Sequence, residues 1–163
     1  MPTLAITLFP SRYIQGPDAL NALRVETTRL GTKPLLVCDT YVSSNILPSV
    51  QATLDSPACE AVIEGPCCTS SVAKATWTAQ QNSCDVVIGV GGGKVIDAAK
   101  LVAEHSALPL IVVPSIAATD APCSAIAVLC NENGCLERYV FLKRSPDLVL
   151  VDTSLIRRAP TRM

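Results

Sequence analysis

Short runs of apolar residues recur along this chain, and they constrain its fold more than any other feature. Pro34–Cys38 (PLLVC), Leu110–Val113 (LIVV) and Leu148–Val151 (LVLV) are examples, and Asp85–Val90 (DVVIGV) is the strongest. A strand without polar positions must be covered on both faces, which is typical of parallel sheets between two layers of helices. The stretches between these runs have the length of helical crossovers. The sequence therefore predicts an α/β fold with a mostly parallel sheet and helices on both faces.

The remaining elements follow from periodicity and turn residues. Ser124–Cys130 and Glu137–Leu142 flank the turn Asn131–Gly134, which predicts an antiparallel hairpin inserted into the parallel series. Helical spacing or strand-like runs predict six further elements. The helices are Pro17–Leu30, Val42–Leu54 with a break near Pro48, Ser70–Gln81 capped by Ser70 or Ser71, and Lys94–Glu104, and the strands are Leu4–Phe9 and Cys59–Ile63.

Composition excludes several classes of function. The chain has 163 residues, which suggests a single domain over 1–163, with 13 basic and 14 acidic side chains and 4% aromatics. This balance makes nucleic acid a poor partner. No apolar run approaches the ~18 residues of a membrane span, so no membrane association is expected. The eight cysteines form no C-x-x-C pair and the start lacks a signal peptide, which indicates reduced thiols and a cytoplasmic location.

Three consecutive glycines, Gly91–Gly93, separate the strongest strand from the helix that begins at Lys94. The N–H groups at a helix N-terminus attract phosphate, and glycine lets phosphate oxygens approach closely. Neither the Walker motif nor G-x-G-x-x-G is present, because Val95 follows the lysine and Ile96 takes the place of the third glycine. The sequence predicts a phosphate cradle of another class, and the alternative is a tight strand–helix turn without a ligand.

Asp39 directly follows an apolar strand, where a carboxylate can bind a ribose diol and favour NAD over NADP. A turn-forming role is the alternative. Asp39 precedes the glycine loop by two strand–helix units, so the usual dinucleotide-binding order, with the acid after the loop, is not expected. On the helix after the loop, Lys94, Asp97 and Lys100 are spaced for local ion pairs, either on an exposed face or beside a ligand.

The segment Ser115–Ser124 (SIAATDAPCS) follows an apolar strand and combines hydroxyl groups with one carboxylate, Asp120. Such a loop can hydrogen-bond a cofactor and direct an acid at a substrate, and an ordinary connection is the alternative. His105 is the single histidine, so a zinc site within the chain would contain at most one histidine ligand. Its place at the end of a helix favours a capping role over a ligand role.

Three segments together resemble the glycerol dehydrogenases of the iron-containing alcohol dehydrogenase superfamily. They are GVGGGKVIDAAK (89–100), PLIVVPSIAATDAPCSAIAVL (109–129) and PDLVLVDTSLIRRAPTRM (146–163), and SRYIQGPDAL (11–20) is similar to the family's opening strand and helix. The resemblance implies a Rossmann-like NAD-binding domain of an enzyme that oxidises glycerol to dihydroxyacetone with a catalytic zinc ion.

The resemblance also implies roles for single residues. Asp39 would face the adenosine ribose, and Asp120 would lie beside substrate and metal as the catalytic residue. Cys130 stands where relatives have a tyrosine that touches the cofactor, and Ala118 stands where they often have a serine. The cofactor-binding residues implied are Asp39, Gly92, Gly93, Lys94, Asp97, Ser115, Ala118, Thr119, Ser124, Ile126 and Cys130.

In the family, the zinc ligands are an aspartate in a G-I-G-D segment and two histidines, in a helical C-terminal domain. The segments that match this chain stop before them, so we expect no zinc and no turnover from this chain alone. A separate C-terminal domain chain and further copies of this chain are the expected partners, with a glycerol-like polyol as substrate of the complete enzyme. The alternatives are a domain of a related metal-dependent hydroxy-acid or polyol dehydrogenase, or a non-catalytic nucleotide-binding remnant.

Overall fold

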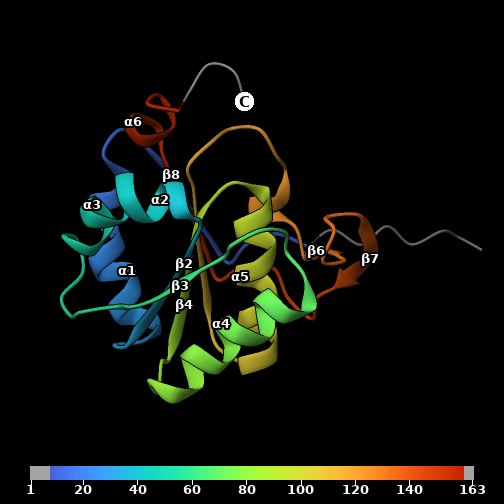
Figure 1. The fold of residues 1–163 in the computed structure, drawn as a ribbon. Helices are drawn as coiled ribbons and strands as arrows, with labels where there is room; N and C mark the ends of the chain where they lie inside the picture. Colours follow the sequence, from blue (N-terminus) through green and yellow to red (C-terminus); the bar gives the residue numbers. More distant parts are fainter. Residues whose placement is uncertain (1–7, 160–163) are drawn as a thin grey trace, which may run out of the picture.

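Six strands form a wholly parallel sheet in the order β1-β8-β5-β4-β2-β3. Figure 1 shows helices on either side of this sheet. The computed structural model describes residues 8–159. Every residue of β2, β4 and β5 is buried, as their unbroken apolar runs predict. The strands are β1 (Arg12–Gly16), β2 (Pro34–Cys38), β3 (Cys59–Val62), β4 (Val86–Gly91), β5 (Leu110–Pro114) and β8 (Leu148–Asp152).

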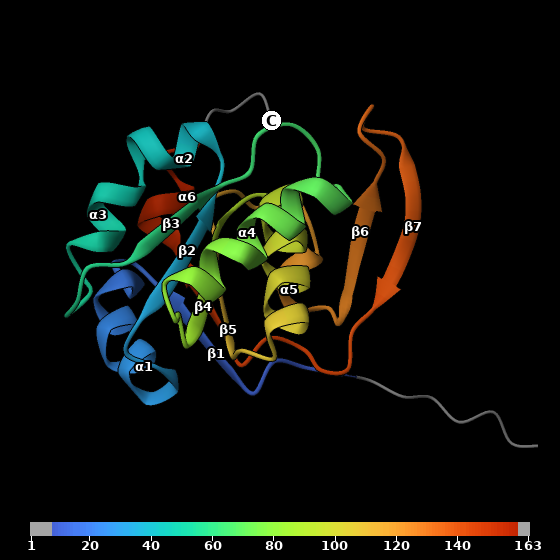
Figure 2. The ribbon, with the colours of Figure 1, turned by 60° about the horizontal axis from the view of Figure 1, so that its bottom comes forward.

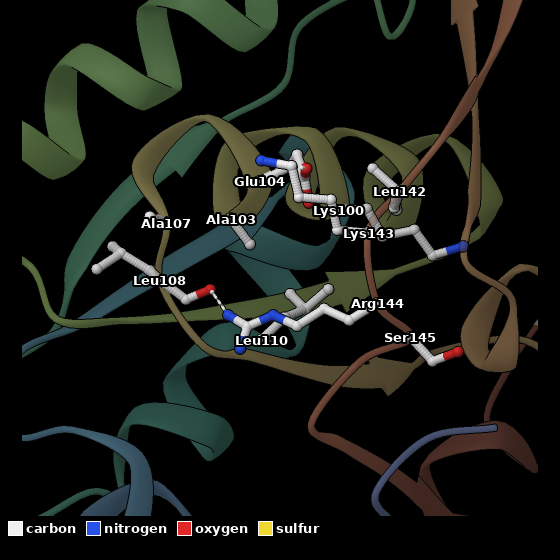
Figure 3. A pocket seen from close by; sticks show the side chains of 10 residues that line it. All are labelled: Lys100, Ala103, Glu104, Ala107, Leu108, Leu110, Leu142, Lys143, Arg144 and Ser145. Carbon is white, nitrogen blue, oxygen red and sulfur yellow. Dashed lines mark hydrogen bonds and ion pairs between the residues drawn. The ribbon is translucent and has the colours of Figure 1, made fainter. Parts of the chain in front are cut away.

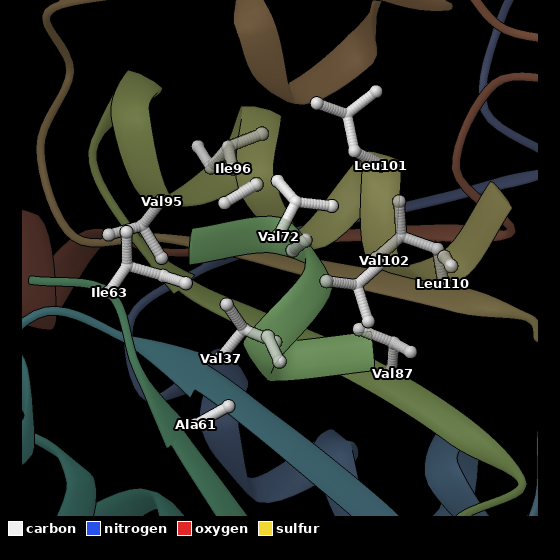
Figure 4. Close-up of a cluster of buried hydrophobic side chains, with 14 of the residues drawn as sticks. Val37, Ala61, Ile63, Val72, Val87, Val95, Ile96, Leu101, Val102 and Leu110 are labelled. Carbon is white, nitrogen blue, oxygen red and sulfur yellow. The ribbon is translucent and has the colours of Figure 1, made fainter. Parts of the chain in front are cut away.

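Helices cover both faces of the sheet, so the predicted α/β class is confirmed. Figure 4 shows the core on one face, where Val37 and Val87 of the sheet meet Val72 of α4 and Val102 of α5. A second cluster fills the other face beneath the N-terminal helices. The helices are α4 (Thr69–Gln81) and α5 (Gly93–Ser106) on the first face, and η1 (Ala19–Ala22), α1 (Leu23–Leu30), α2 (Thr40–Asn45), α3 (Leu47–Gln51) and α6 (Thr153–Ile156) on the second.

The predicted hairpin is also confirmed. β6 (Ile126–Cys130) and β7 (Leu136–Phe141) pair antiparallel and form a separate small sheet. Ala127 and Leu129 are buried, and β6 contacts α5. Figure 2 shows the hairpin beside the main body, with β7 as the outermost strand.

Several predicted boundaries differ from the structure. The helix predicted over Pro17–Leu30 is a short 3-10 helix followed by α1. The helix predicted over Val42–Leu54 is two helices that break at Ile46, because Pro48 lies in the first turn of α3. The predicted cap of α4 at Ser70 or Ser71 is wrong, since Cys68 is the N-cap and Ser71 accepts a hydrogen bond from its N–H at 3.0 Å.

The predicted first strand, Leu4–Phe9, lies mostly outside the described residues, and residues 8 and 9 form no strand. The first described strand is β1, in the segment that the family resemblance assigns to the opening strand. Within residues 8–159, no helix has the length and apolar content needed to cross a bilayer.

The strand order places a topological switch between β2 and β4. From β2 the chain moves outward to the edge strand β3 and then returns to form β4 on the other side of β2. Connections that leave in opposite directions open a crevice at the carboxyl ends of the two strands, which is where open parallel sheets bind their ligands. The order also explains why Asp39, after β2, precedes the glycine loop, after β4.

Candidate functional site

A pocket of about 250 Å³ lies at the switch point. Asp39 after β2, Gly92 after β4 and Ser115 after β5 all line it, together with Val42 and Ile116. Three segments that are distant in the sequence therefore converge on one crevice. Small-molecule sites usually occupy roughly 300–1,000 Å³, so this pocket suits part of a dinucleotide rather than all of it.

The Asp39 carboxylate has a structural contact as well as a place in the pocket. Asp39 caps α2, because one carboxylate oxygen accepts a hydrogen bond from the Val42 N–H at 2.9 Å. The turn-forming alternative is therefore present in the structure. It uses one of two oxygens, and a carboxylate can accept further hydrogen bonds at the other. A cap and a ribose contact are compatible at this residue.

The three glycines have different reasons to lack a side chain. A Cβ at Gly91 would lie 2.7 Å from the Cβ of Val95, so Gly91 allows α5 to pack closely on β4. A Cβ at Gly92 would instead point toward the Cδ1 of Ile116 at 2.9 Å, across the pocket. Gly93 is the first residue of α5, and its Cβ would lie 3.4 Å from the Thr119 hydroxyl. Packing against Val95 thus explains Gly91, the Ile116 side chain limits the space at Gly92, and a Cβ at Gly93 would make an ordinary contact.

The N-terminus of α5 provides the donor groups that a phosphate requires. Gly92 is the N-cap in an extended conformation, and its carbonyl accepts the N–H groups of Val95 and Ile96 at 3.0 Å each. α5 is 14 residues long, so its positive end is well developed. Lys94 is exposed in the first turn and adds a positive charge. This end of α5 can attract an anion that enters the pocket.

Asp97 and Lys100 form a buried cluster between α5 and the hairpin. Their side chains lie 3.8 Å apart, and the two residues are 8% and 1% exposed, so the exposed-face interpretation is wrong. The Lys100 ammonium donates to the carbonyl of Ile126 at 2.7 Å and to the hydroxyl of Ser124 at 3.0 Å. Burial raises the pKa of Asp97, although Lys100 and the Val128 N–H favour its charged form. Burial likewise lowers the pKa of Lys100.

Lys100 is the site residue that sequence reasoning undervalued. It sits among Ala98, Ala99, Leu101 and Val102, and a lysine within such an apolar stretch must find buried partners. Its hydrogen-bond partners are Ser124, at the end of the Ser115–Ser124 loop, and Ile126, just after it. Through these hydrogen bonds, Lys100 links Ser124 and Ile126 to α5, the helix that begins at the glycine cradle.

The loop between β5 and β6 has two differently placed halves. Ser115 is buried, and its N–H donates to the Gly91 carbonyl at 3.0 Å. Thr119 and Asp120 are exposed and line a second pocket of about 200 Å³ on the other side of Ile116. Asp120 precedes a one-turn 3-10 helix, η2 (Ala121–Cys123), but its side chain makes no capping hydrogen bond. A carboxylate without a capping contact is available for a ligand.

Ala118 and Cys130 lie outside both pockets. Ala118 is exposed in the loop. Cys130 ends β6, where its N–H donates to the carbonyl of Cys67 at 2.8 Å, next to the N-terminus of α4. Burial raises the pKa of Cys67 to about 12, which marks it as an inert thiol.

Two other hollows do not share these features. Figure 3 shows a pocket of about 280 Å³ between Lys143, Arg144 and the end of α5. Leu110, which lines it, is the first residue of β5, so this pocket lies at the end of the sheet opposite the crevice. Arg144 is already bound there to the carbonyl of Leu108 at 2.9 Å. A groove of about 450 Å³ along α4 contains Glu60, Glu64 and Glu132, which would repel a phosphate.

Within the described part of the chain, no group of three or more His, Cys, Asp or Glu side chains is arranged to hold a metal ion. Residues 8–159 by themselves therefore do not form a zinc site. Asp120 is the carboxylate of the loop that could join a site completed by other residues.

Comparisons with known proteins identify the family of the chain. A family profile described as iron-containing alcohol dehydrogenase matches residues 10–153. The chain is 39% identical to the glycerol dehydrogenase of Thermotoga maritima over 98% of its own length and 44% of that protein. It is 37% identical to the glycerol dehydrogenase of Pseudomonas putida, over 94% of this chain and 43% of that protein.

Solved structures give the same result. The crystal structure of a probable glycerol dehydrogenase from Sinorhizobium meliloti superposes with a TM-score of 0.87 at 34% identity. That match covers 96% of this chain and 43% of the other. The chain thus spans less than half the length of the relatives to which it is similar.

Proposed function

This chain belongs to the iron-containing alcohol dehydrogenase family, and from that premise we propose that it is the NAD-binding domain of a glycerol-dehydrogenase-like oxidoreductase. The observation that carries the proposal is the convergence of Asp39, Gly92 and Ser115 on one pocket at the switch point of the sheet. The helical, metal-binding half of the site would come from another segment or chain. The complete enzyme would oxidise glycerol or a similar polyol with NAD.

The chemistry of the pocket suits NAD. The Asp39 carboxylate would accept hydrogen bonds from the adenosine ribose diol, and a 2′-phosphate would be repelled there. The N–H groups at the start of α5, with Lys94, would bind the pyrophosphate. Gly92 lines the pocket, and a side chain there would press on Ile116 across it, so glycine leaves this part of the pocket free for phosphate oxygens. When bound, the cofactor supplies the hydride-accepting ring.

The substrate end would lie beyond Ile116, toward Thr119 and Asp120. Asp120 would orient a substrate hydroxyl, and Lys100 would hold the Ser124–Ile126 segment in place behind it. Asp97, Ala118 and Cys130 line neither pocket. Each would therefore contribute to cofactor binding only from the edge of this arrangement.

Calorimetric titration with NAD and NADP tests the proposal. Half of a cleft leaves much of the cofactor exposed, so we expect a dissociation constant of roughly 0.1 mM or weaker for NAD, about −5 kcal/mol. NADP should bind more weakly, and Asp39→Asn should reduce that preference. Equal binding of both cofactors by the unmodified chain would argue against the role of Asp39.

A second experiment tests the oxidoreductase assignment. The chain is mixed with the separately produced remaining part of the Thermotoga maritima glycerol dehydrogenase, and NADH formation from glycerol is followed. Turnover that requires both components supports an incomplete dehydrogenase. NAD binding without turnover with glycerol, hydroxy acids or other polyols would instead favour a non-catalytic nucleotide-binding role.

A further inference from the structure

Two cysteines that are distant in the sequence are paired where the hairpin meets the main body. Cys68 directly precedes α4, Cys130 ends β6, and the two residues are partners in an isolated parallel β-bridge. The Cys130 N–H donates to the carbonyl of Cys67 at 2.8 Å, which holds the two segments together. Figure 2 shows the start of α4 beside the end of β6. Both thiols of the pair are free.

The backbone places these two thiols within reach of a disulfide bond. Neighbouring strands lie roughly 4.8 Å apart, and the side chains of directly paired residues stand on the same face of the ladder. A disulfide joins Cα atoms that are about 4.4–6.8 Å apart. The pairing of β6 with β7 shifts register between Leu129 and Cys130, so the end of β6 is not held by a regular ladder. Little movement is therefore needed to bring the sulfurs of Cys68 and Cys130 together.

The Cys68 thiol lies among groups that favour its thiolate form. Cys68 is the N-cap of α4, a helix of 13 residues, so its sulfur lies at the positive end of the helix and accepts the Ser71 N–H. The sulfur is also 3.2 Å from the hydroxyl of Ser70. Burial would raise the pKa of the Cys68 thiol, but the hydrogen bonds with Ser70 and Ser71 outweigh burial and lower this pKa. The thiolate is the form of cysteine that reacts with oxidants.

A proton acceptor and a path from solvent complete the surroundings of Cys68. The Cys68 thiol donates to a carboxylate oxygen of Glu132 at 3.3 Å. Cys68 is only 3% exposed, but it lines the groove of about 450 Å³ along α4. Glu60, Glu64 and Glu132 line the same groove and repel an anionic oxidant such as glutathione disulfide. The thiol is therefore suited to an oxidant that is small and uncharged.

Other buried thiols lack these features. Burial raises the pKa of Cys38 and of Cys67 to about 12. The thiols of Cys59 and Cys84 are close enough to hydrogen-bond, but burial and this neighbour raise the pKa of Cys84 to about 12. The thiols of Cys38, Cys67 and Cys84 stay protonated at neutral pH and react slowly. Proximity alone therefore does not distinguish the pair at Cys68 from the pair at Cys59.

From this geometry we propose that Cys68 and Cys130 form an oxidation site, in which a hydroperoxide such as hydrogen peroxide converts the two thiols into a disulfide. The Cys68 thiolate attacks one peroxide oxygen, the O–O bond breaks, hydroxide leaves, and Cys68 becomes a sulfenic acid. The Cys130 sulfur then attacks the Cys68 sulfur, the S–O bond breaks, and the leaving hydroxyl departs as water with the Cys130 proton. The two sulfurs lose two electrons, and the peroxide gains them. The disulfide fastens the end of β6 to the start of α4, and the inference does not depend on NAD binding.

Peptide mapping of the peroxide-treated chain tests the proposal. The chain is exposed to hydrogen peroxide at neutral pH, the peroxide is removed with catalase, and free thiols are alkylated in urea before digestion and mass spectrometry. The first disulfide should join Cys68 to Cys130, while the exposed Cys135 should remain alkylated. The oxidised chain should melt at a higher temperature, because the cross-link restricts the unfolded chain, and dithiothreitol should reverse this change. A first disulfide between Cys59 and Cys84, or no disulfide at all, would overturn the proposal.

Three variants assign the steps to single thiols. Cys68→Ser retains a good N-cap, so it should fold normally and form no disulfide with Cys130. Cys67→Ala is the matched control, because it removes the neighbouring thiol, and it should form the disulfide as the unmodified chain does. In Cys130→Ser the sulfenic acid has no partner, so unfolding with dimedone after peroxide treatment should label Cys68.

The same variants show how the proposal would fail. A disulfide between Cys67 and Cys130 that forms equally well in Cys68→Ser would assign the reaction to the wrong thiol. In Cys130→Ser, a dimedone label on the exposed Cys135 in place of Cys68 would show that exposure, and not the surroundings of Cys68, decides which thiol is oxidised.

Discussion

Replacing Lys100 with methionine should destabilise the chain far more than a typical lysine substitution. Lys100 is 1% exposed, and its ammonium contacts Ile126, Ser124 and Asp97. Methionine matches the length of the side chain but removes both hydrogen bonds and leaves the Asp97 carboxylate buried without a counter-charge. Breaking a buried pair from one side costs about 3–5 kcal/mol. Removing the ammonium also removes the free-energy cost of burying it, which offsets part of this loss. We therefore expect the free energy of unfolding to fall by about 3 kcal/mol.

The assay is urea unfolding followed by circular dichroism, with thermal melts alongside. A loss of about 3 kcal/mol corresponds to a melting temperature lower by roughly 6–12 °C in a chain of this size. Lys94→Met is the matched control, because Lys94 is on the same helix but exposed, and it should change the stability by less than about 0.5 kcal/mol. Equal effects of the two substitutions would refute the buried role of Lys100.

A double-mutant cycle and pH dependence refine this prediction. Asp97→Asn removes the unpaired carboxylate, so the double variant should be less destabilised than the sum of the single variants by about 1–2 kcal/mol. The pKa of Asp97 is raised in the folded state, so its contribution to stability is present below the unfolded pKa and lost as pH rises through the folded one. Without Lys100 this pKa rises further, and the defect of Lys100→Met should therefore shrink in acid.

Three further predictions concern the pocket, the loop and the fold. Gly92→Val should abolish NAD binding in calorimetry, because a branched side chain would fill the cradle against Ile116. Gly16→Val is the control and should bind NAD normally, since no atom lies within 4 Å of a Cβ at this position. Normal NAD binding by the Gly92 variant would exclude the cradle. Asp120→Asn should change NAD affinity by less than about threefold and leave the melting temperature unchanged. The same variant should lower kcat/KM of a reconstituted enzyme by about 100-fold. A large fall in melting temperature would instead indicate a structural role for Asp120. Partial burial would raise the pKa of Asp85, but hydrogen bonds from Thr32 and Lys33 outweigh burial and lower this pKa. The stability that Asp85 contributes is therefore present above its pKa in the unfolded chain and is lost as the pH falls through its pKa in the folded chain. Asp85→Asn should thus lose about 1–3 kcal/mol at pH 7 and show a weaker dependence in acid, while Asp55→Asn, an exposed partner of Arg24, should change little; equal acid sensitivity of Asp85→Asn and the unmodified chain would contradict this.

The sheet could be predicted from the sequence because strands buried on both faces leave an unmistakable pattern. The runs in β2, β4, β5 and β8 contain almost no polar residue, and the predicted ranges agree with the observed strands to within one residue. The hairpin was equally clear from the turn at Asn131–Gly134. β1 carries Arg12 and Gln15 and lies at the edge of the sheet, so periodicity gave no strong signal and only the family resemblance indicated it.

Side-chain partners were harder to predict. The spacing of Asp97 and Lys100 is the same for an exposed ion pair and a buried one, and only the position of the hairpin against α5 decides between them. The cap of α4 was misplaced because Cys68 is a weak capping residue, and two serines follow it. The convergence of Asp39 and Gly92 required the strand order, which the sequence pattern does not contain.

NAD is proposed to bind at the crevice between β2 and β4. A titration with NAD followed by two-dimensional ¹⁵N–¹H NMR of the labelled chain tests it most directly, because every amide reports its own environment. The amides of Asp39–Val42, Gly91–Asp97 and Ser115–Ile116 should shift together with a single dissociation constant, and the same titration of Gly92→Val should leave them unchanged. Shifts confined to Leu108, Lys143 and Arg144, which lie at the amino end of β5 away from the crevice, would contradict NAD binding there. The absence of any shift at millimolar NAD would contradict it too.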